Sequence, residues 1–451
     1  MSVFTGQRLA PEVFQLDGER LPRGWYSDQY FLNIAHLLSA LAASGYRFEG
    51  TAPRGLDAHD VDTGNLVVEM QVFTRRKPHS LIAGVDEALA ILQTATGHHD
   101  DSGVFTNTYD RLEVEAVQDG VILPYDGDPR NVLPVLRIRG RYRDFAVLET
   151  PILGALTEAT RVATNVYEVL EAANGKDVSF FPARFAHYKM QALHGYAYQL
   201  AVNAYEAAHG RGSGMHVSTD EQGAWWGGHG GGTIAHAAIA CFLGDTTETM
   251  VQFCRYHDPA VPRTALIDFH NDCVGTTLAV MERLFTLYLE AKRGGRHDEA
   301  RRYRLDAVRP DTSGSLRDVS VPPLGDKALD CGVNPRLVYA LREAIDGAWA
   351  AWQVPFEFLD EARAWCARVK ITVTGGFSPA KIRSFEALGV PVDTYGVGSW
   401  LLSNSDDNGT NNDYTADVVR VLVDGAWVDM AKVGRRPRDN ALLEPVSTPR
   451  T

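Results

Sequence analysis

Cysteine is scarce in this sequence of 451 residues, and its five occurrences lie far apart, at positions 241, 254, 273, 331 and 366. No two of them form a C-x-x-C pair, the spacing on which many zinc and redox motifs depend. We therefore expect reduced thiols, and neither a zinc site nor a disulfide framework.

Positive charge is also in short supply, since 44 Lys and Arg stand against 57 Asp and Glu and give a formal net charge of -13. Such a chain is not expected to coat nucleic acid or an anionic membrane, although a locally basic pocket can still hold a small anion. No run of about 20 apolar residues is present, and the first residues lack the charged start and apolar core of a signal peptide. We expect a cytoplasmic protein.

Two consecutive strand–glycine–helix units stand out near the C-terminal end. Val369–Thr374 alternates like a strand and is followed by Gly375-Gly376, after which Ser378-Pro379 begins a helix. Val390–Tyr395 predicts a second strand, which ends in Gly396-Val397-Gly398. Glycines let the backbone approach a ligand closely, and the free N–H groups at a helix start bind phosphate. The pattern indicates either a phosphate site or two tight turns.

Short apolar strands alternate with helices from about residue 179 onward, which is typical of a parallel β/α barrel. Before this region, Arg111–Ile138 reads as a small antiparallel sheet. After it, Val418–Val423 and Ala426–Val433 predict a hairpin, and Gly434–Thr451 a loosely held tail. The expected barrel strands are Ser179–Phe185, Gly214–Ser218, Gly232–Ala235, Thr264–Phe269, Arg304–Val308, Val369–Thr374 and Val392–Tyr395.

Arg309 and Asp311 follow a predicted strand, at the end where β/α barrels carry their active sites. A guanidinium binds carboxylate or phosphate through two hydrogen bonds, and a carboxylate accepts from hydroxyls or helps to hold magnesium. The alternative is a plain salt bridge between the two. Arg75-Arg76-Lys77 is a basic cluster in an acidic chain, and is either a solvated loop or a binding element.

Short motifs recur along nearly the whole chain, at Ser27–Tyr30, Phe73–Pro78 with Ala83-Gly84 and Glu87–Leu89, Leu148–Leu153, Ala163-Thr164, Gly232–Ala237, Ala265–Asp268, Val308–Thr312, Thr374–Gly376 and Tyr395–Gly398. In order and spacing these motifs resemble those of the nicotinate phosphoribosyltransferase family, and more closely its archaeal-type branch. Two segments depart from the pattern: Arg184 stands alone where the family usually has paired arginines, and residues 220–231 are rich in glycine and tryptophan.

The resemblance implies an α/β fold: an irregular β/α (TIM-like) barrel with an N-terminal α+β domain completed by the C-terminal hairpin. The corresponding domains are 1–147, 148–402, and a linker, hairpin and tail at 403–451. It also implies the joining of nicotinate to 5-phosphoribosyl 1-pyrophosphate with ATP hydrolysis, in a magnesium-dependent reaction that forms nicotinate mononucleotide and pyrophosphate. A homodimer with shared active sites is expected.

Roles for individual residues follow from the same resemblance. His236 is expected to accept a phosphoryl group from ATP, Arg309 to pair with a carboxylate, and Asp311 to contact ribose or, like Asp268, magnesium. Tyr30 is expected to stack on the pyridine ring, and Arg76 to reach a neighbouring subunit's site. The remaining expected substrate-binding residues are Arg184, Thr233, Asp268, Gly375, Gly376, Gly396 and Gly398.

Other functions remain open at this stage. The base could be nicotinamide instead of nicotinate, because an arginine also contacts an amide oxygen. Quinolinate is a further alternative for the base. A non-catalytic barrel that binds a phosphoribosyl ligand is a further alternative, although phosphate binding alone requires only the glycine loops and neither Arg309, Asp311 nor His236. An isomerase or aldolase is disfavoured, because no buried lysine or paired carboxylates are evident at the predicted strand ends.

Overall fold

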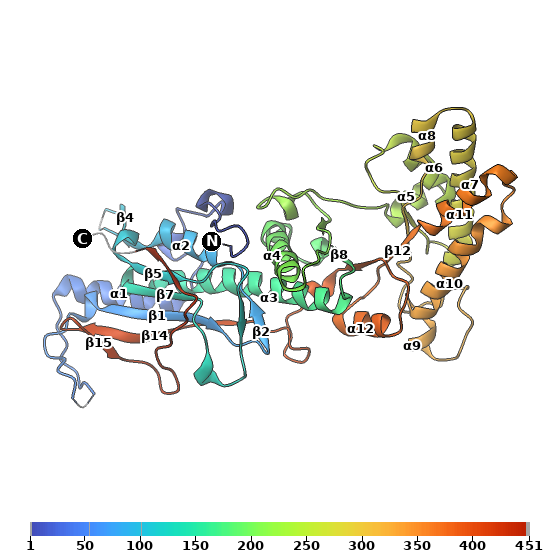
Figure 1. Cartoon of the computed structure of the whole chain (residues 1–451). Helices are drawn as coiled ribbons and strands as arrows, with labels where there is room; N and C mark the ends of the chain where they lie inside the picture. The colour runs from blue at the N-terminus through green and yellow to red at the C-terminus, as the bar shows by residue number, and fades with distance from the viewer. Residues whose placement is uncertain (1, 54, 101, 448–451) are drawn as a thin grey trace. The chain divides into compact units, whose positions relative to one another are not determined.

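The computed structural model describes residues 2–53, 55–100 and 102–447. The chain forms two compact units (Figure 1). The first comprises Met1–Tyr167, Tyr196–Ala207 and Ser403–Thr451, and the second comprises Glu168–Gly195 and Ala208–Leu402. None of the helices in the described residues is long and apolar enough to cross a bilayer.

The first unit is built on a six-stranded antiparallel sheet with the strand order β15-β14-β1-β7-β5-β16. Its strands are β1 (Val67–Thr74), β5 (Glu113–Ala116), β7 (Leu136–Arg141), β14 (Tyr414–Val423), β15 (Ala426–Asp429) and β16 (Glu444–Ser447). Figure 1 shows β14, from the end of the chain, running beside β1. The prediction that the C-terminal hairpin completes the N-terminal domain is confirmed.

One face of this sheet carries the hydrophobic core. Helices α2 (Val85–Ala95) and the start of α3 (Glu149–Ala173) contribute Leu89, Leu92 and Leu156, which are buried against sheet residues such as Met70, Val72 and Ile138. Alternation along β1 places Glu69 and Gln71 on the opposite face from Met70 and Val72. Helix α1 (Gln29–Ser44), and the two-stranded pairs β2 (His79–Leu81) with β6 (Ile122–Pro124) and β3 (Gly97–His99) with β4 (Phe105–Asn107), complete the unit.

Part of the predicted tail, Gly434–Thr451, is ordered, and residues 448–451 lie outside the described residues. Its residues 444–447 form β16, which pairs with β5 at the edge of the sheet. The sequence of β16, Glu-Pro-Val-Ser, carries little strand signal of its own, so backbone pairing with β5 decides its conformation.

The second unit contains a six-stranded parallel sheet with the order β10-β11-β12-β13-β8-β9. Its strands are β8 (Asp177–Phe180), β9 (His216–Val217), β10 (Thr264–Leu266), β11 (Ala307–Arg309), β12 (Lys370–Val373) and β13 (Thr394–Val397). The sheet is a half-barrel flanked by helices, and the expected fold class is confirmed. The helices are α4 (Gln191–His209, shared with the first unit), α5 (His236–Cys241), α6 (Thr246–Tyr256), α7 (Cys273–Arg293), α8 (His297–Arg302), α9 (Lys327–Asp330), α10 (Pro335–Gly347), α11 (Leu359–Ala367) and α12 (Pro379–Ala387).

One predicted barrel strand is wrong. Gly232–Ala235 forms no strand and leads irregularly into α5. Only Gly230 makes an isolated bridge, to Val217 of β9. The segment is preceded by two further glycines, so that Gly230, Gly231 and Gly232 are consecutive. Glycines have no side chains to bury and lose much conformational entropy when they are ordered, so this run does not stabilise a strand.

Candidate active site

Five neighbouring strands of the second unit bring most of the predicted site residues to one edge of the sheet. Because the strands are parallel, their carboxyl ends lie on the same side. The residues at or just after these ends are, in spatial order, Asp268 (β10), Arg309 and Asp311 (β11), Gly375 and Gly376 (β12), Gly396 and Gly398 (β13) and Arg184 (β8). Strand β8 precedes the others in the chain by many residues, yet it pairs with β13.

His236 and Asp268 form a pair at one end of this row. His236 is the first residue of α5, and its Nε2 lies 3.1 Å from Asp268 Oδ1. The imidazole is 46% exposed, whereas the carboxylate is only 9% exposed. Burial raises the pKa of Asp268, His236 opposes this shift, and the negative charge of Asp311 adds to it. The contact orients the ring and leaves one side of it open to solvent.

Arg309, at the end of the neighbouring strand β11, is a half-buried cation. Its Nη2 donates to the backbone oxygen of Ile234 at 2.9 Å, while its Nε is buried without a hydrogen-bond partner. Burial lowers the pKa of Arg309, and the charges of Asp311 and Asp268 oppose that shift. Among the described residues Arg309 and Asp311 form no ion pair, so the plain salt bridge that the sequence left open does not occur. The guanidinium therefore retains hydrogen-bonding capacity for an anion.

Asp311 is tied to the glycine loop after β12. The Thr374 hydroxyl donates to Asp311 Oδ1. Gly375 and Gly376 have φ angles of +94° and +69°, and a Cβ on Gly375 would lie 3.4 Å from the Asp311 backbone oxygen. This left-handed conformation at two successive residues favours glycine. It turns the chain sharply into α12.

Gly396 within β13 and Gly398 just after it are required by close packing. A Cβ on Gly396 would lie 2.5 Å from Thr374 Cγ2, and one on Gly398 would lie 2.8 Å from Phe185 Cε2. The neighbouring loops after β12, β13 and β8 are thereby held against one another. The structure thus gives each glycine a packing reason, which is compatible with a phosphate-binding loop but does not require one.

Arg184, at the β8 end of this row, and Thr233, next to it in the prediction but outside the row, are the other predicted residues of the second unit. Arg184 is exposed and packs over the ring of Phe185, with 5.1 Å between the guanidinium carbon and the ring centroid. Thr233 is half-buried, and its hydroxyl lies 3.4 Å from the Ile234 oxygen, which also accepts from Arg309. Both are placed to extend the polar lining of the edge.

Lys381, in the first turn of α12, is a candidate that the sequence predictions missed. Its Nζ donates to the Gly375 oxygen at 3.3 Å and lies 4.2 Å from the centroid of the Phe377 ring. Burial lowers the pKa of Lys381 to about 8. No carboxylate among the described residues forms an ion pair with it. The sequence pattern that could have identified Lys381 is a basic residue three positions after the N-cap Ser378, shortly after the glycine pair.

Tyr30 and Arg76 belong to the first unit. Tyr30 is 61% exposed, and its hydroxyl lies 3.5 Å from Asp28 Oδ2. Arg76 is only 3% exposed and donates from Nη1 to the Thr410 oxygen at 3.4 Å. The sequence predicted that Arg76 reaches a neighbouring subunit's site. In the structure Arg76 is instead buried within its own unit and does not project. The exposed members of its cluster are Arg75 and Lys77.

Comparisons with known proteins agree with this architecture. Residues 57–160 match the family described as quinolinate phosphoribosyl transferase, N-terminal domain. The structure resembles nicotinate-nucleotide pyrophosphorylase from Pyrococcus furiosus, with a TM-score of 0.59 and 22% identity over 97% of this chain and 86% of that one. It also resembles human nicotinic acid phosphoribosyltransferase, with a TM-score of 0.52 and 16% identity over 88% and 74% of the two chains. No curated protein matches the sequence.

The family match covers residues 57–160, and the likeness to the two solved structures is one of fold. The described residues contain no cluster of three or more metal-ligating side chains. Asp268 and Asp311 nevertheless lie close enough for the charge of one to raise the pKa of the other. Mg²⁺ is commonly held by one or two carboxylates together with substrate phosphates, and this donor set fits that mode.

Proposed function

We propose that the protein is a nicotinate phosphoribosyltransferase, which forms nicotinate mononucleotide and pyrophosphate from nicotinate and 5-phosphoribosyl 1-pyrophosphate. The observation that carries the proposal is Arg309, a half-buried guanidinium with a buried Nε that lacks a partner. A cation held in this way favours a ligand with a carboxylate or phosphate. The glycine loops after β12 and β13 lie along the same sheet edge and suit the 5′-phosphate.

The reaction breaks a C–O bond at the anomeric carbon through a transition state with oxocarbenium character, as glycoside hydrolysis does. No protein nucleophile is needed, so positioning and electrostatics supply the rate. Asp311, which accepts a hydrogen bond from Thr374, would accept from ribose hydroxyls, and with Asp268 it would hold Mg²⁺. The ion would neutralise charge on the leaving pyrophosphate.

His236 is the proposed link to ATP. A neutral imidazole is a competent nucleophile toward a phosphoryl group. Asp268 orients the ring through Nε2, so Nδ1 remains for the phosphoryl group, and the exposure of the ring leaves room for it. Attack of Nδ1 on the γ-phosphorus of ATP would form a phosphohistidine and release ADP. Hydrolysis of this phosphohistidine to free phosphate would couple ATP to synthesis.

A second candidate is quinolinate as the base, which the match of residues 57–160 favours. Quinolinate carries two carboxylates, so it requires a second cation beside Arg309. Arg184 and Lys381 are the other cations described along the glycine-loop side of the edge. A nicotinamide enzyme and a non-catalytic binding protein are further outcomes of the same test.

Purified protein should be supplied with 5-phosphoribosyl 1-pyrophosphate and each of the three bases, with and without ATP. The proposal expects nicotinate mononucleotide from nicotinate, little product from nicotinamide, and stimulation by ATP. Product with release of CO₂ from quinolinate alone would replace nicotinate with the second candidate, and no product from any base would reject an enzyme of this class. Sedimentation of the same preparation tests the proposed homodimer, which a fully active monomer would contradict.

A further inference from the structure

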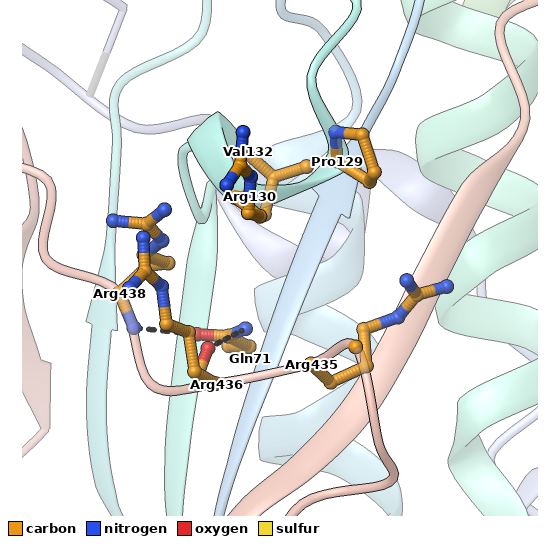
Figure 2. Close-up of a pocket in the computed structure, with 8 residues that line it drawn as sticks. Gln71, Pro129, Arg130, Val132, Arg435, Arg436 and Arg438 are labelled. Carbon is orange, nitrogen blue, oxygen red and sulfur yellow. Dashed lines mark hydrogen bonds between the residues drawn. The ribbon is translucent and has the colours of Figure 1, made fainter.

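A basic cavity lies in the first unit, among residues that the proposed reaction does not use. Its volume is about 190 Å³. The lining residues are Gln71, Pro129, Arg130, Val132, Gly434, Arg435, Arg436 and Arg438 (Figure 2). Four arginines around one small cavity contrast with the net charge of -13 carried by the whole chain.

The cavity is a built feature, because the backbone that carries three of the arginines is anchored. The side chain of Gln71, which is 1% exposed, donates from Nε2 to the Arg436 oxygen and accepts from the Arg438 nitrogen, both at 3.1 Å. Arg137 Nη2 donates to the Arg438 oxygen at 2.7 Å. Figure 2 shows the Gln71 amide bridging the two residues. Segment 434–439 is thus held on the polar face of β1.

Two of the four arginines already have carboxylate partners. Arg130 pairs with Asp128 at 2.7 Å, and Arg435 pairs with Asp417 at 2.8 Å. Arg436 and Arg438, in contrast, form no ion pair with any residue that the structure describes. The Nε and Nη2 atoms of Arg438 are also shielded from solvent without a hydrogen-bond partner.

The positive charges around Arg438 are only partly balanced by a carboxylate. Loss of solvent lowers the pKa of Arg438, the positive charges of Arg436 and Arg130 lower it further, and Asp128 acts in the opposite direction. Figure 2 shows the side chains of Arg436 and Arg438 rising on the same side of the segment as Arg130, with Arg435 turned away. Like charges held close together raise the free energy unless an anion lies between them.

We propose that this cavity binds the phosphate or pyrophosphate group of a small molecule. Planar guanidinium groups bind phosphate oxygens through paired hydrogen bonds, and shielded N–H groups without partners are the donors such an anion would satisfy. The volume is below the roughly 300–1,000 Å³ of pockets that enclose drug-sized ligands, so it admits the phosphate group and leaves the rest of the molecule outside.

The test is calorimetric titration of the full-length protein with inorganic phosphate, pyrophosphate and ATP. Lys381→Met serves as the background, so that binding at the glycine loop of the second unit is weakened. The double variant Arg436→Gln/Arg438→Gln should weaken pyrophosphate binding by about tenfold or more. The matched control is Arg47→Gln, which removes an exposed arginine that is paired with Asp62. It should bind pyrophosphate as tightly as the Lys381→Met protein from which it is made.

A second double variant, Arg436→Lys/Arg438→Lys, keeps both charges but loses the paired hydrogen bonds, and should lose less affinity than the Gln pair. Unfolding temperatures of all variants identify any loss that comes from misfolding. Tighter binding of ATP than of pyrophosphate identifies a nucleotide as the source of the phosphate group, and the reverse order identifies a free anion. Pyrophosphate and ATP binding that is unchanged in a folded Gln pair would overturn the proposal.

Discussion

Replacing Lys381 with methionine should weaken binding of a sugar phosphate at the glycine loop after β12. The ammonium lies 3.3 Å from the Gly375 oxygen and forms no ion pair with a described carboxylate, so a phosphate bound there would be its anionic partner. Hydrogen bonds to charged groups contribute about 1.5–3 kcal/mol, which corresponds to a loss of roughly 10- to 150-fold in affinity. Ribose 5-phosphate is the probe, and its dissociation constant is measured by calorimetry at pH 7.

The pH dependence supplies a sharper test. Burial lowers the pKa of Lys381 from 10.5 to about 8, so in the free protein the lysine loses its charge as pH rises through 8. The phosphate remains a dianion in this range, since its second pKa is about 6. Affinity of the native protein should therefore fall above pH 8, by at most about tenfold per pH unit. Lys381→Met should show a flat profile.

The same substitution should stabilise the protein. Lowering a lysine pKa from 10.5 to about 8 corresponds to roughly 3 kcal/mol at pH 7 as an upper figure. The unfolded chain holds the proton more tightly, so the destabilisation is greatest below pH 8 and disappears as pH approaches 10.5. Lys381→Met should therefore unfold at a higher denaturant concentration at pH 7, with the gain shrinking toward pH 10.

Lys370→Met is the matched control, because Lys370 is exposed at the opposite, amino end of the adjoining strand β12. It should change neither affinity nor its pH profile. If Lys381→Met binds ribose 5-phosphate as tightly as the native protein, or retains the decline above pH 8, the assignment of Lys381 to the phosphate is wrong.

Three further predictions concern other groups. Arg309→Ala should raise the KM for nicotinate by about 10- to 150-fold, because a charged hydrogen bond is lost, and equal turnover of nicotinamide by the native protein would contradict the reasoning. His236→Ala should abolish acid-labile, base-stable labelling by γ-labelled ATP and the ATP stimulation but leave slow synthesis, so label that persists in the variant rejects the role. Burial raises the pKa of Glu87 from 4.5 to about 7, so stability from this group is lost as pH rises between these values. In denaturant unfolding at pH 8, Glu87→Gln should therefore be more stable than the native protein by at most about 3 kcal/mol, and the gain should be smaller at pH 5. The control Glu282→Gln, at an exposed position, should show no such difference between the two pH values.

Local patterns in the sequence determined much of this protein. Alternating β-branched residues and terminal glycines predicted β12, β13 and the start of α12, and strand-end polar residues predicted Asp268, Arg309 and Asp311 at one edge. These signals are reliable because strand period, turn conformation and helix capping depend on a few neighbouring residues. The carboxyl ends of parallel strands then meet at one edge whatever their order in the chain.

Other features depended on contacts between distant segments. Pairing of β8 with β13 brings Phe185, the residue after Arg184, against Gly398. Pairing of β16 with β5 orders a segment that the sequence predicted to be a loosely held tail. Arg76 looked exposed by composition but is buried beside Thr410.

Lys381 at the glycine loop and the arginines of the cavity show most clearly what the sequence determines and what the folded structure decides. The sequence by itself determined that cations follow Gly375 and Gly434, because Lys381, Arg436 and Arg438 stand there in the chain. Only the tertiary structure decided which cations lack carboxylate partners, because burial and the positions of Asp128 and Asp417 are set by the folded chain. The free energy of a charge depends on its solvent exposure and on neighbours from any part of the sequence, and a one-dimensional pattern contains neither quantity.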